Sequence, residues 1–188
     1  MRVRSFVAVP LDAAAQRALV ALERELARAA PELKWVDPEL MHLTLKFLGD
    51  VAEERLPEVT SAVRAALAPF RAFDVQLSGA GAFPDPAHAR VLWAGAGAGT
   101  PELASLARAV EEAVEPLGFE RESREWRAHV TLSRVKTRLR EPAKLQEALA
   151  APHELPRFRV DRVHLMKSEQ SPRGLSYTPL ATMELMPA

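Results

Sequence analysis

The chain lacks cysteine, has no long apolar run and carries no net charge over its 188 residues. The absence of cysteine excludes disulfide bonds and zinc sites with thiolate ligands. No apolar run is long enough to cross a membrane, and the N-terminus lacks the basic stretch and apolar segment of a signal peptide. We therefore expect a soluble, cytoplasmic protein with no membrane partner, and a chain of this length can bury a sizeable core.

The zero net charge comes from 25 basic and 25 acidic residues. This balance argues against a broad, non-specific surface for nucleic acids. The charges are nevertheless uneven, because residues 120–140 contain seven basic and three acidic side chains. This local excess is either an ordinary solvated surface or a positive wall that attracts phosphate groups.

One tetrad of sequence, His-aliphatic-Thr-Leu, begins at His42 and again at His129. Each copy lies in an apolar run that predicts a β-strand. Alternate side chains of a strand share a face, so each copy presents one imidazole and one hydroxyl, while its aliphatic residues face a core. An imidazole can act as an acid or a base near neutral pH. Two facing copies would supply an acid, a base and two hydroxyl donors for a phosphate-like anion.

The elements around the tetrads repeat as well. Strand, helix, tetrad strand, helix and strand follow one another twice, over approximate repeats of residues 3–83 and 90–166. We predict an α+β fold in which residues 1–188 form one bilobal domain. Its two pseudo-symmetric lobes each contain an antiparallel sheet with helices packed outside, and the His-x-Thr strands face a central cleft.

Cap residues mark the starts of two predicted helices. Asp12 precedes a helical pattern with leucines on one side, and Thr100 precedes a second one with Pro101 at its first position. Gly118 is well placed to end this second helix.

Several segments resemble the 2H phosphoesterase superfamily: residues 4–11, the run from Trp35 to Gly49 and residues 126–134. The most similar branch is the bacterial and archaeal RNA 2′,3′-cyclic phosphodiesterases, also called 2′-5′ RNA ligases. Residues 168–177 are similar to the closing segment of that branch, so the resemblance spans essentially the whole chain. The family commonly has proline before the second histidine, where this chain has Ala128.

The resemblance implies hydrolysis of RNA 2′,3′-cyclic phosphodiester ends to a 2′-phosphate by metal-free acid-base catalysis. His42 and His129 are the catalytic residues, with His42 as proton donor and His129 as acceptor. Thr44 and Thr131 would bind the phosphate oxygens. Run in reverse, the reaction would join RNA ends through a 2′-5′ linkage without ATP. We expect no cofactor, an RNA with a 2′,3′-cyclic phosphate end as partner, and a monomeric protein.

Two arginines are candidates for substrate binding. Regular alternation places Arg127 on the face of His129 and Arg134 on the opposite face. The resemblance favours Arg134, and a bulge or the end of the strand near Ser133 would reconcile the two. By the same alternation, Lys46 is predicted on the face of the first histidine.

Three aromatic residues have two readings each. Trp35 and Phe47 could stack a nucleobase, but aromatics beside an apolar strand usually belong to the core, which we predict for Phe47. Tyr177 either lines the site, as the family suggests, or packs in the interior. The other histidines, His88, His153 and His164, have no partners at ligand spacing, so no metal site is predicted.

Other functions remain open at this point. The same core could hydrolyse a small cyclic nucleotide or a 2′-5′ oligonucleotide. It could also belong to a non-catalytic module that binds nucleotides or RNA, or to a structural protein whose repeated strands only build a sheet. Whether the two imidazoles face one cleft would distinguish an enzyme from these last two classes.

Overall fold

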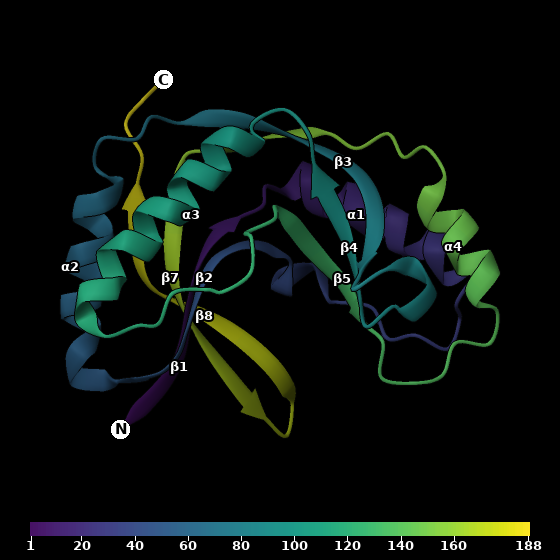
Figure 1. Cartoon of the computed structure of the whole chain (residues 1–188), viewed down its shortest axis with the longest axis horizontal. Coiled ribbons are helices and arrows are strands. Elements are labelled where there is room, and N and C mark those ends of the chain that lie inside the picture. Colours follow the sequence, from purple (N-terminus) through teal and green to yellow (C-terminus); the bar gives the residue numbers. More distant parts are fainter.

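The computed structural model describes residues 1–188, and its eight strands form one antiparallel sheet (Figure 1). The strands are β1 (Arg2–Pro10), β2 (His42–Ala52), β3 (Phe73–Phe83), β4 (Val91–Ala96), β5 (His129–Arg134), β6 (Arg157–Val160), β7 (Arg162–Ser171) and β8 (Gly174–Glu184). The helices are α1 (Ala13–Ala27), α2 (Leu56–Leu67), α3 (Thr100–Val114) and α4 (Pro142–Ala150). The predicted α+β class is confirmed. None of the helices combines the length and apolarity that a membrane span requires.

The sheet has the strand order β6-β3-β4-β5-β2-β1-β7-β8. Its middle is weakly joined, because β2 and β5 share a single residue pair, Leu43 with Val130. The sheet therefore consists of two four-stranded halves that meet at the tetrads. We call them the β2 half, formed by β2, β1, β7 and β8, and the β5 half, formed by β5, β4, β3 and β6.

Each half combines elements from both ends of the chain. Strand β3 pairs with β4 in the β5 half, and β7 pairs with β1 in the β2 half. The helices cross over in the same way: α2 and α3 pack together beside the β2 half, and α1 and α4 lie beside the β5 half (Figure 1). The pattern of strands and helices repeats along the sequence, but the two repeats do not form separate lobes. The last strand and the first helix of each repeat pack in the lobe that contains the tetrad of the other repeat.

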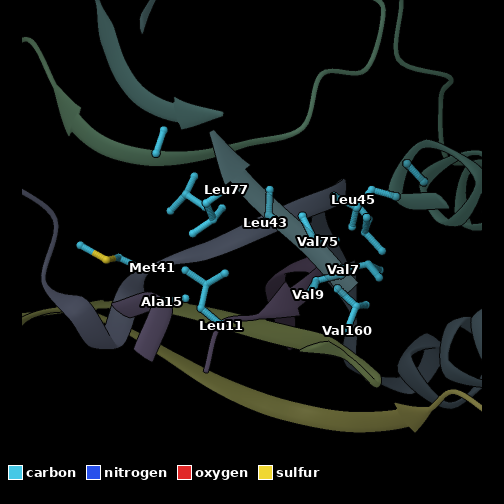
Figure 2. Close-up of a cluster of buried hydrophobic side chains, with 14 of the residues drawn as sticks. Val7, Val9, Leu11, Ala15, Met41, Leu43, Leu45, Val75, Leu77 and Val160 are labelled. Carbon is cyan, nitrogen blue, oxygen red and sulfur yellow. The ribbon is translucent and has the colours of Figure 1, made fainter. Parts of the chain in front are cut away.

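A continuous apolar core underlies both halves and contains 38 buried residues. Figure 2 shows part of it, where Leu43 and Leu45 of β2 lie with Val7 and Val9 of β1 and with Val160 of β6. Each fully buried side chain of this kind contributes about 1.5–3 kcal/mol relative to an exposed one. The aliphatic positions of the tetrads thus anchor their strands and leave the histidines and threonines on the other face.

Both tetrad strands are bulged at the same place. The register of β2 with β1 skips Leu45, and the register of β5 with β4 skips Leu132. Two consecutive residues are therefore buried in each strand, Leu45 with Lys46 and Leu132 with Ser133. Each bulge shifts the alternation by one residue, so the next side chain returns to the face of the histidine.

Of the two N-cap residues predicted from the sequence, the one for α1 is correct and the one for α3 is not. Asp12 caps α1 by accepting a 2.8 Å hydrogen bond from the backbone N–H of Ala15. The prediction that Thr100 caps α3 is wrong by one residue, since Gly99 is the N-cap and has φ of 89°. A side chain at Gly99 would also collide with strand β3. Gly118, with φ of 87°, ends the helical segment after α3.

Candidate active site

The pairing of β2 with β5 brings the two tetrads side by side. Leu43 and Val130 are antiparallel partners and are fully buried, so the residues that flank them face the open side. This register sets each histidine beside the threonine of the other copy. The neighbours are His42 with Thr131, and His129 with Thr44. All four are partly buried, and the structure therefore gathers all four predicted polar groups on one face.

Both imidazoles are held in the same orientation by the backbone. Nδ1 of His42 donates to the carbonyl of Leu40 at 2.7 Å, and Nδ1 of His129 donates to the carbonyl of Arg127 at 2.8 Å. Each acceptor lies two residues before its histidine. These bonds occupy Nδ1, so Nε2 is the nitrogen of each ring that remains available to exchange a proton. In the neutral ring of His42, Nε2 accepts from the Thr44 hydroxyl at 2.9 Å.

Aromatic rings enclose the two histidines. The ring of Phe6 is 4.8 Å from that of His42, and Tyr177 stands edge-on to the same imidazole at 5.3 Å. On the other side, Phe83 stands edge-on to His129 at 5.0 Å. Of the two readings for Tyr177, the one that lines the site therefore holds. These rings restrict rotation of the imidazoles and exclude water from one side of each.

The surroundings make both imidazoles harder to protonate. Burial is the main cause that lowers the pKa of His42, and the positive charges of His129 and Arg134 lower it further. Burial and the charge of Arg134 lower the pKa of His129 as well. Each protonated ring therefore disfavours protonation of its neighbour. A bound anion would oppose these effects and allow one ring to hold a proton.

The two candidate arginines differ in how they relate to the histidines. The bulge in β5 is present and turns Arg134 toward the site, so regular alternation, which placed it on the opposite face, fails here. Its charge acts on both imidazoles and also on Tyr177. Arg127 lies at the rim beside His129, with an exposed side chain 3.7 Å from Glu125.

Lys46 does not share the face of His42, and the prediction is wrong because of the bulge in β2. Its side chain is 6% exposed and forms a 2.7 Å ion pair with Glu111 of α3. It also donates to the carbonyl of Glu120 at 2.6 Å. Lys46 therefore ties β2 to α3 and to the loop after that helix.

Phe47 is the site residue that sequence reasoning missed. It was predicted in the core, yet it is 61% exposed and lines the cavity that contains Thr44 and His129. The signal for its position is its spacing, because Phe47 follows His42 by the same five residues that separate Arg134 from His129. The other aromatic candidate, Trp35, packs against the core and bridges to β5.

A cavity of about 690 Å³ is lined by Thr44 and His129 on one side. Strand β2, helix α3 and the segment 121–127 form its walls, and Arg108, Arg121 and Arg124 lie among them. Trp126 fixes that segment, since its Nε1 donates to the carbonyl of Thr44 at 3.1 Å. Part of the basic excess noted in the sequence therefore borders this cavity.

A smaller cavity of about 290 Å³ lies beside His129 and is lined by Trp93 and Phe83. Two of the remaining histidines have partners of their own outside the tetrads. His88 is exposed and pairs with Asp85, and His153 contacts a helix carbonyl. Nowhere do three or more histidine, aspartate or glutamate side chains gather as metal ligands.

Comparison with known proteins gives matches over nearly the full length. A family model described as the 2′-5′ RNA ligase superfamily matches residues 10–172. A protein of Methanothermobacter thermautotrophicus, named RNA 2′,3′-cyclic phosphodiesterase, is 36% identical over 98% of this chain and 100% of its own. A crystal structure of a Thermus thermophilus protein has a TM-score of 0.80 at 29% identity, over 98% of both chains. The apo crystal structure of E. coli LigT, at 23% identity, has the same fold with a TM-score of 0.80 over 98% of both chains.

Proposed function

Because the chain belongs to the 2′-5′ RNA ligase superfamily, we propose that it hydrolyses RNA 2′,3′-cyclic phosphate ends to 2′-phosphates. The observation that carries this proposal is the pair of backbone-oriented imidazoles on one face, both within the field of Arg134. Relatives over 30% identical, such as the Methanothermobacter protein, have the corresponding name. All of these groups come from one chain, so a monomer suffices.

In the proposed reaction, water attacks phosphorus from the side of His129, whose Nε2 takes the proton. Nε2 of His42, in its protonated form, delivers a proton to the departing 3′ oxygen. The ribose keeps the phosphate on its 2′ oxygen. This assignment of donor and acceptor follows the family resemblance. Positioned acid-base groups of this kind contribute about 10²–10⁴-fold each to the rate.

The non-bridging oxygens need donors that strengthen as negative charge builds on the phosphoryl group. Arg134 supplies a cation on this face, and the hydroxyls of Thr44 and Thr131 supply neutral donors. In the free protein the Thr44 hydroxyl satisfies His42. Substrate would therefore replace this bond, and the threonine would turn from the imidazole to the phosphate.

Substrate charge also sets the protonation of the pair. Burial and like charges lower the pKa of both rings in the free protein, and the anionic phosphate raises it again. One proton is then shared by two rings that act in opposite states, which gives a bell-shaped pH profile. We expect both limbs of kcat to lie at higher pH than those of kcat/KM, because kcat reports the complex with the anion.

Ligation would use the same ring opening, with an RNA 5′-hydroxyl in place of water as the group that attacks phosphorus. The smaller cavity lies on the side of His129, where the attacking group is held in this mechanism, and has a volume of about 290 Å³. This observation favours ATP-independent 2′-5′ ligation as a second activity of the same site.

The direct test is an assay on a short RNA that ends in a 2′,3′-cyclic phosphate, with EDTA present. We expect conversion to a terminal 2′-phosphate, identified by ³¹P NMR, at a rate that chelation does not change. A 3′-phosphate product would contradict the assigned direction of ring opening. Loss of activity with EDTA would indicate a metalloenzyme, and binding without turnover would indicate a non-catalytic module.

A further inference from the structure

We propose that Trp93 of β4 is the floor of a second nucleoside subsite, which holds the 5′-terminal nucleoside of the RNA that attacks in ligation. The proposal rests on the proposed function and deepens it, because it assigns the acceptor of the ligation reaction to a place on the protein. Its basis is an indole ring that lies flat over two glycines, in the cavity of about 290 Å³ beside His129.

The register of the sheet places Trp93 next to the second tetrad. Strands β3, β4 and β5 lie side by side in the β5 half (Figure 1). Trp93 is the cross-strand partner of Thr131, and Gly95 is the partner of His129. Adjacent strands are about 4.8 Å apart, and partners point to the same face of the sheet. The indole therefore borders the tetrad on the side that faces away from β2.

Two glycines allow the indole to lie on the sheet. A side chain at Gly81, the partner of Trp93 on β3, would overlap the six-membered ring of the indole. A side chain at Gly95 would come within 3.1 Å of the same ring. The indole thus occupies the space that both side chains would fill, with one π-face against the backbone. Its other π-face is turned to the cavity that Trp93 lines.

The indole nitrogen is a second observation that points to a ligand on this ring. Nε1 of Trp93 is buried and has no hydrogen-bond partner, and an unpaired buried donor lowers stability. A phenyl ring in this place would avoid that cost. A local cost without a gain in stability is typical of a functional position. The gain here is the larger π-surface of indole, which covers more of a stacked base.

The cavity has the size and lining for one nucleoside. Its volume of about 290 Å³ lies at the lower end of the range for small-molecule sites, about 300–1,000 Å³. Phe83 closes one side, with its ring 5.3 Å from the indole and 5.0 Å from the imidazole of His129. Arg127 also lines the cavity and can pair with the phosphate that follows the first nucleoside.

A nucleoside on this floor would present its 5′-hydroxyl to the base of the proposed mechanism. The 5′ oxygen then bonds to phosphorus as the bond to the 3′ oxygen breaks. His129 takes the proton of the hydroxyl, and His42 gives a proton to the 3′ oxygen. The two RNA ends approach phosphorus from opposite halves of the sheet, so neither blocks the other.

The test compares two ligands with the same charged diester, of which only the first has a second nucleoside. They are 3′-deoxyadenylyl-(2′-5′)-adenosine and 3′-deoxyadenosine 2′-(methyl phosphate). Both lack the 3′-hydroxyl that would reclose the cyclic phosphate, so neither reacts. By isothermal titration, the wild type should bind the dinucleotide about 10-fold more tightly, since stacking on an aromatic ring has effects on this scale.

Trp93→Leu should abolish this 10-fold difference and bind the methyl ester within about twofold of wild type, which also shows that the variant is folded. Trp93→Phe keeps an aromatic ring and should retain most of the difference. Met186→Ala, which changes a part-exposed apolar side chain outside the three cavities, is the control and should retain all of it. Equal affinity of the wild type for both ligands would overturn the subsite. So would an undiminished difference in Trp93→Leu, or an equal loss of affinity for both ligands.

Kinetics separates the subsite from the proposed function. In Trp93→Leu, KM for an acceptor RNA with a 5′-hydroxyl end should rise about 10-fold. Hydrolysis of adenosine 2′,3′-cyclic phosphate should keep its kcat and KM within about twofold, because water needs no platform. A wild type that does not ligate would refute the second activity alone, and the dinucleotide titration would still decide the subsite.

Discussion

The two halves of the sheet have the same backbone plan but different chemistry at the positions that follow the tetrads. In both strands the histidine and threonine face the cleft, a bulge follows, and two buried residues precede an exposed one. The exposed residue is Phe47 in the β2 half and Arg134 in the β5 half. The two halves thus keep an imidazole and a hydroxyl in equivalent places, while the exposed position that follows is an aromatic ring in one half and a cation in the other.

The buried positions diverged as well, with consequences for charge. In the β2 half, Lys46 pairs with Glu111 of α3. The equivalent strand position in the β5 half is Ser133, which donates to the carbonyl of Lys34 at 2.7 Å. The helix beside that half, α1, carries Glu23, and both glutamates lie three residues before the last buried residue of their helix.

Without a lysine partner, the carboxyl group of Glu23 is buried and unpaired. Its Oε1 has no hydrogen-bond partner, and burial raises its pKa to about 8. Glu111 keeps its cation, whereas Glu23 is held as a neutral acid at physiological pH. The equivalent helix positions therefore carry an ion-paired carboxylate in one half and a protonated carboxyl group in the other.

The largest effect is expected at the feature that the halves share. His42→Ala and His129→Ala should each lower hydrolysis by about 10³-fold, since each removes one acid-base group. The double variant should be scarcely worse than either single one, because the two act as a unit. His88→Ala, at an exposed histidine outside the site, is the control and should keep full activity. Strong loss in only one single variant would show that the copies are not functionally paired.

Removing the buried cation should distinguish the halves by stability. Lys46→Ala should lower the free energy of unfolding by about 3 kcal/mol, because it leaves the Glu111 carboxylate without its partner. Ser133→Ala should cost only about 1 kcal/mol, the value of one hydrogen bond. Urea unfolding followed by circular dichroism measures both. Equal losses of unfolding free energy in the two variants would mean that the buried ion pair of Lys46 stabilises the fold no more than the single hydrogen bond of Ser133 does.

Substitution of the two arginines of the β5 half should affect different kinetic quantities. Arg134→Ala should lower kcat by about 10²-fold, the effect of losing one preorganised donor to a developing charge. Arg127→Ala should mainly weaken RNA binding and reduce its salt dependence, since its side chain is exposed at the rim. Steady-state kinetics at two salt concentrations tests this. A larger loss of kcat at Arg127 would reverse the assignment.

The smallest expected effect concerns Glu23 and depends on pH. Its pKa of about 8 in the folded protein exceeds the ordinary value of 4.5, so the unfolded chain loses the proton first. Stability is therefore lost as pH rises from about 4.5 to 8. Glu23→Gln cannot ionise and should be more stable than wild type by a few kcal/mol at pH 9, with little difference at pH 4. Thermal melts at both values check the sign, and a stability gain at pH 4 alone would contradict it.

The sequence by itself determined the parts of this protein that depend on local pattern. The repeated tetrads located both histidines and both threonines, because a strand's alternation assigns faces without knowledge of its neighbours. Apolar periodicity and the cap at Asp12 predicted the α+β class and the start of α1. The family resemblance, carried by the same segments, supplied the reaction and the preference for Arg134.

Only the tertiary structure decided the positions beyond each tetrad. A bulge is a property of two paired strands, and the partners of β2 and β5 lie far away in the sequence. One skipped residue in each register moved Lys46 into an ion pair, Phe47 out of the core and Arg134 toward the imidazoles. The exchange of strands and helices between the lobes has the same origin, because a repeat pattern specifies its elements but not the sheet against which each one packs.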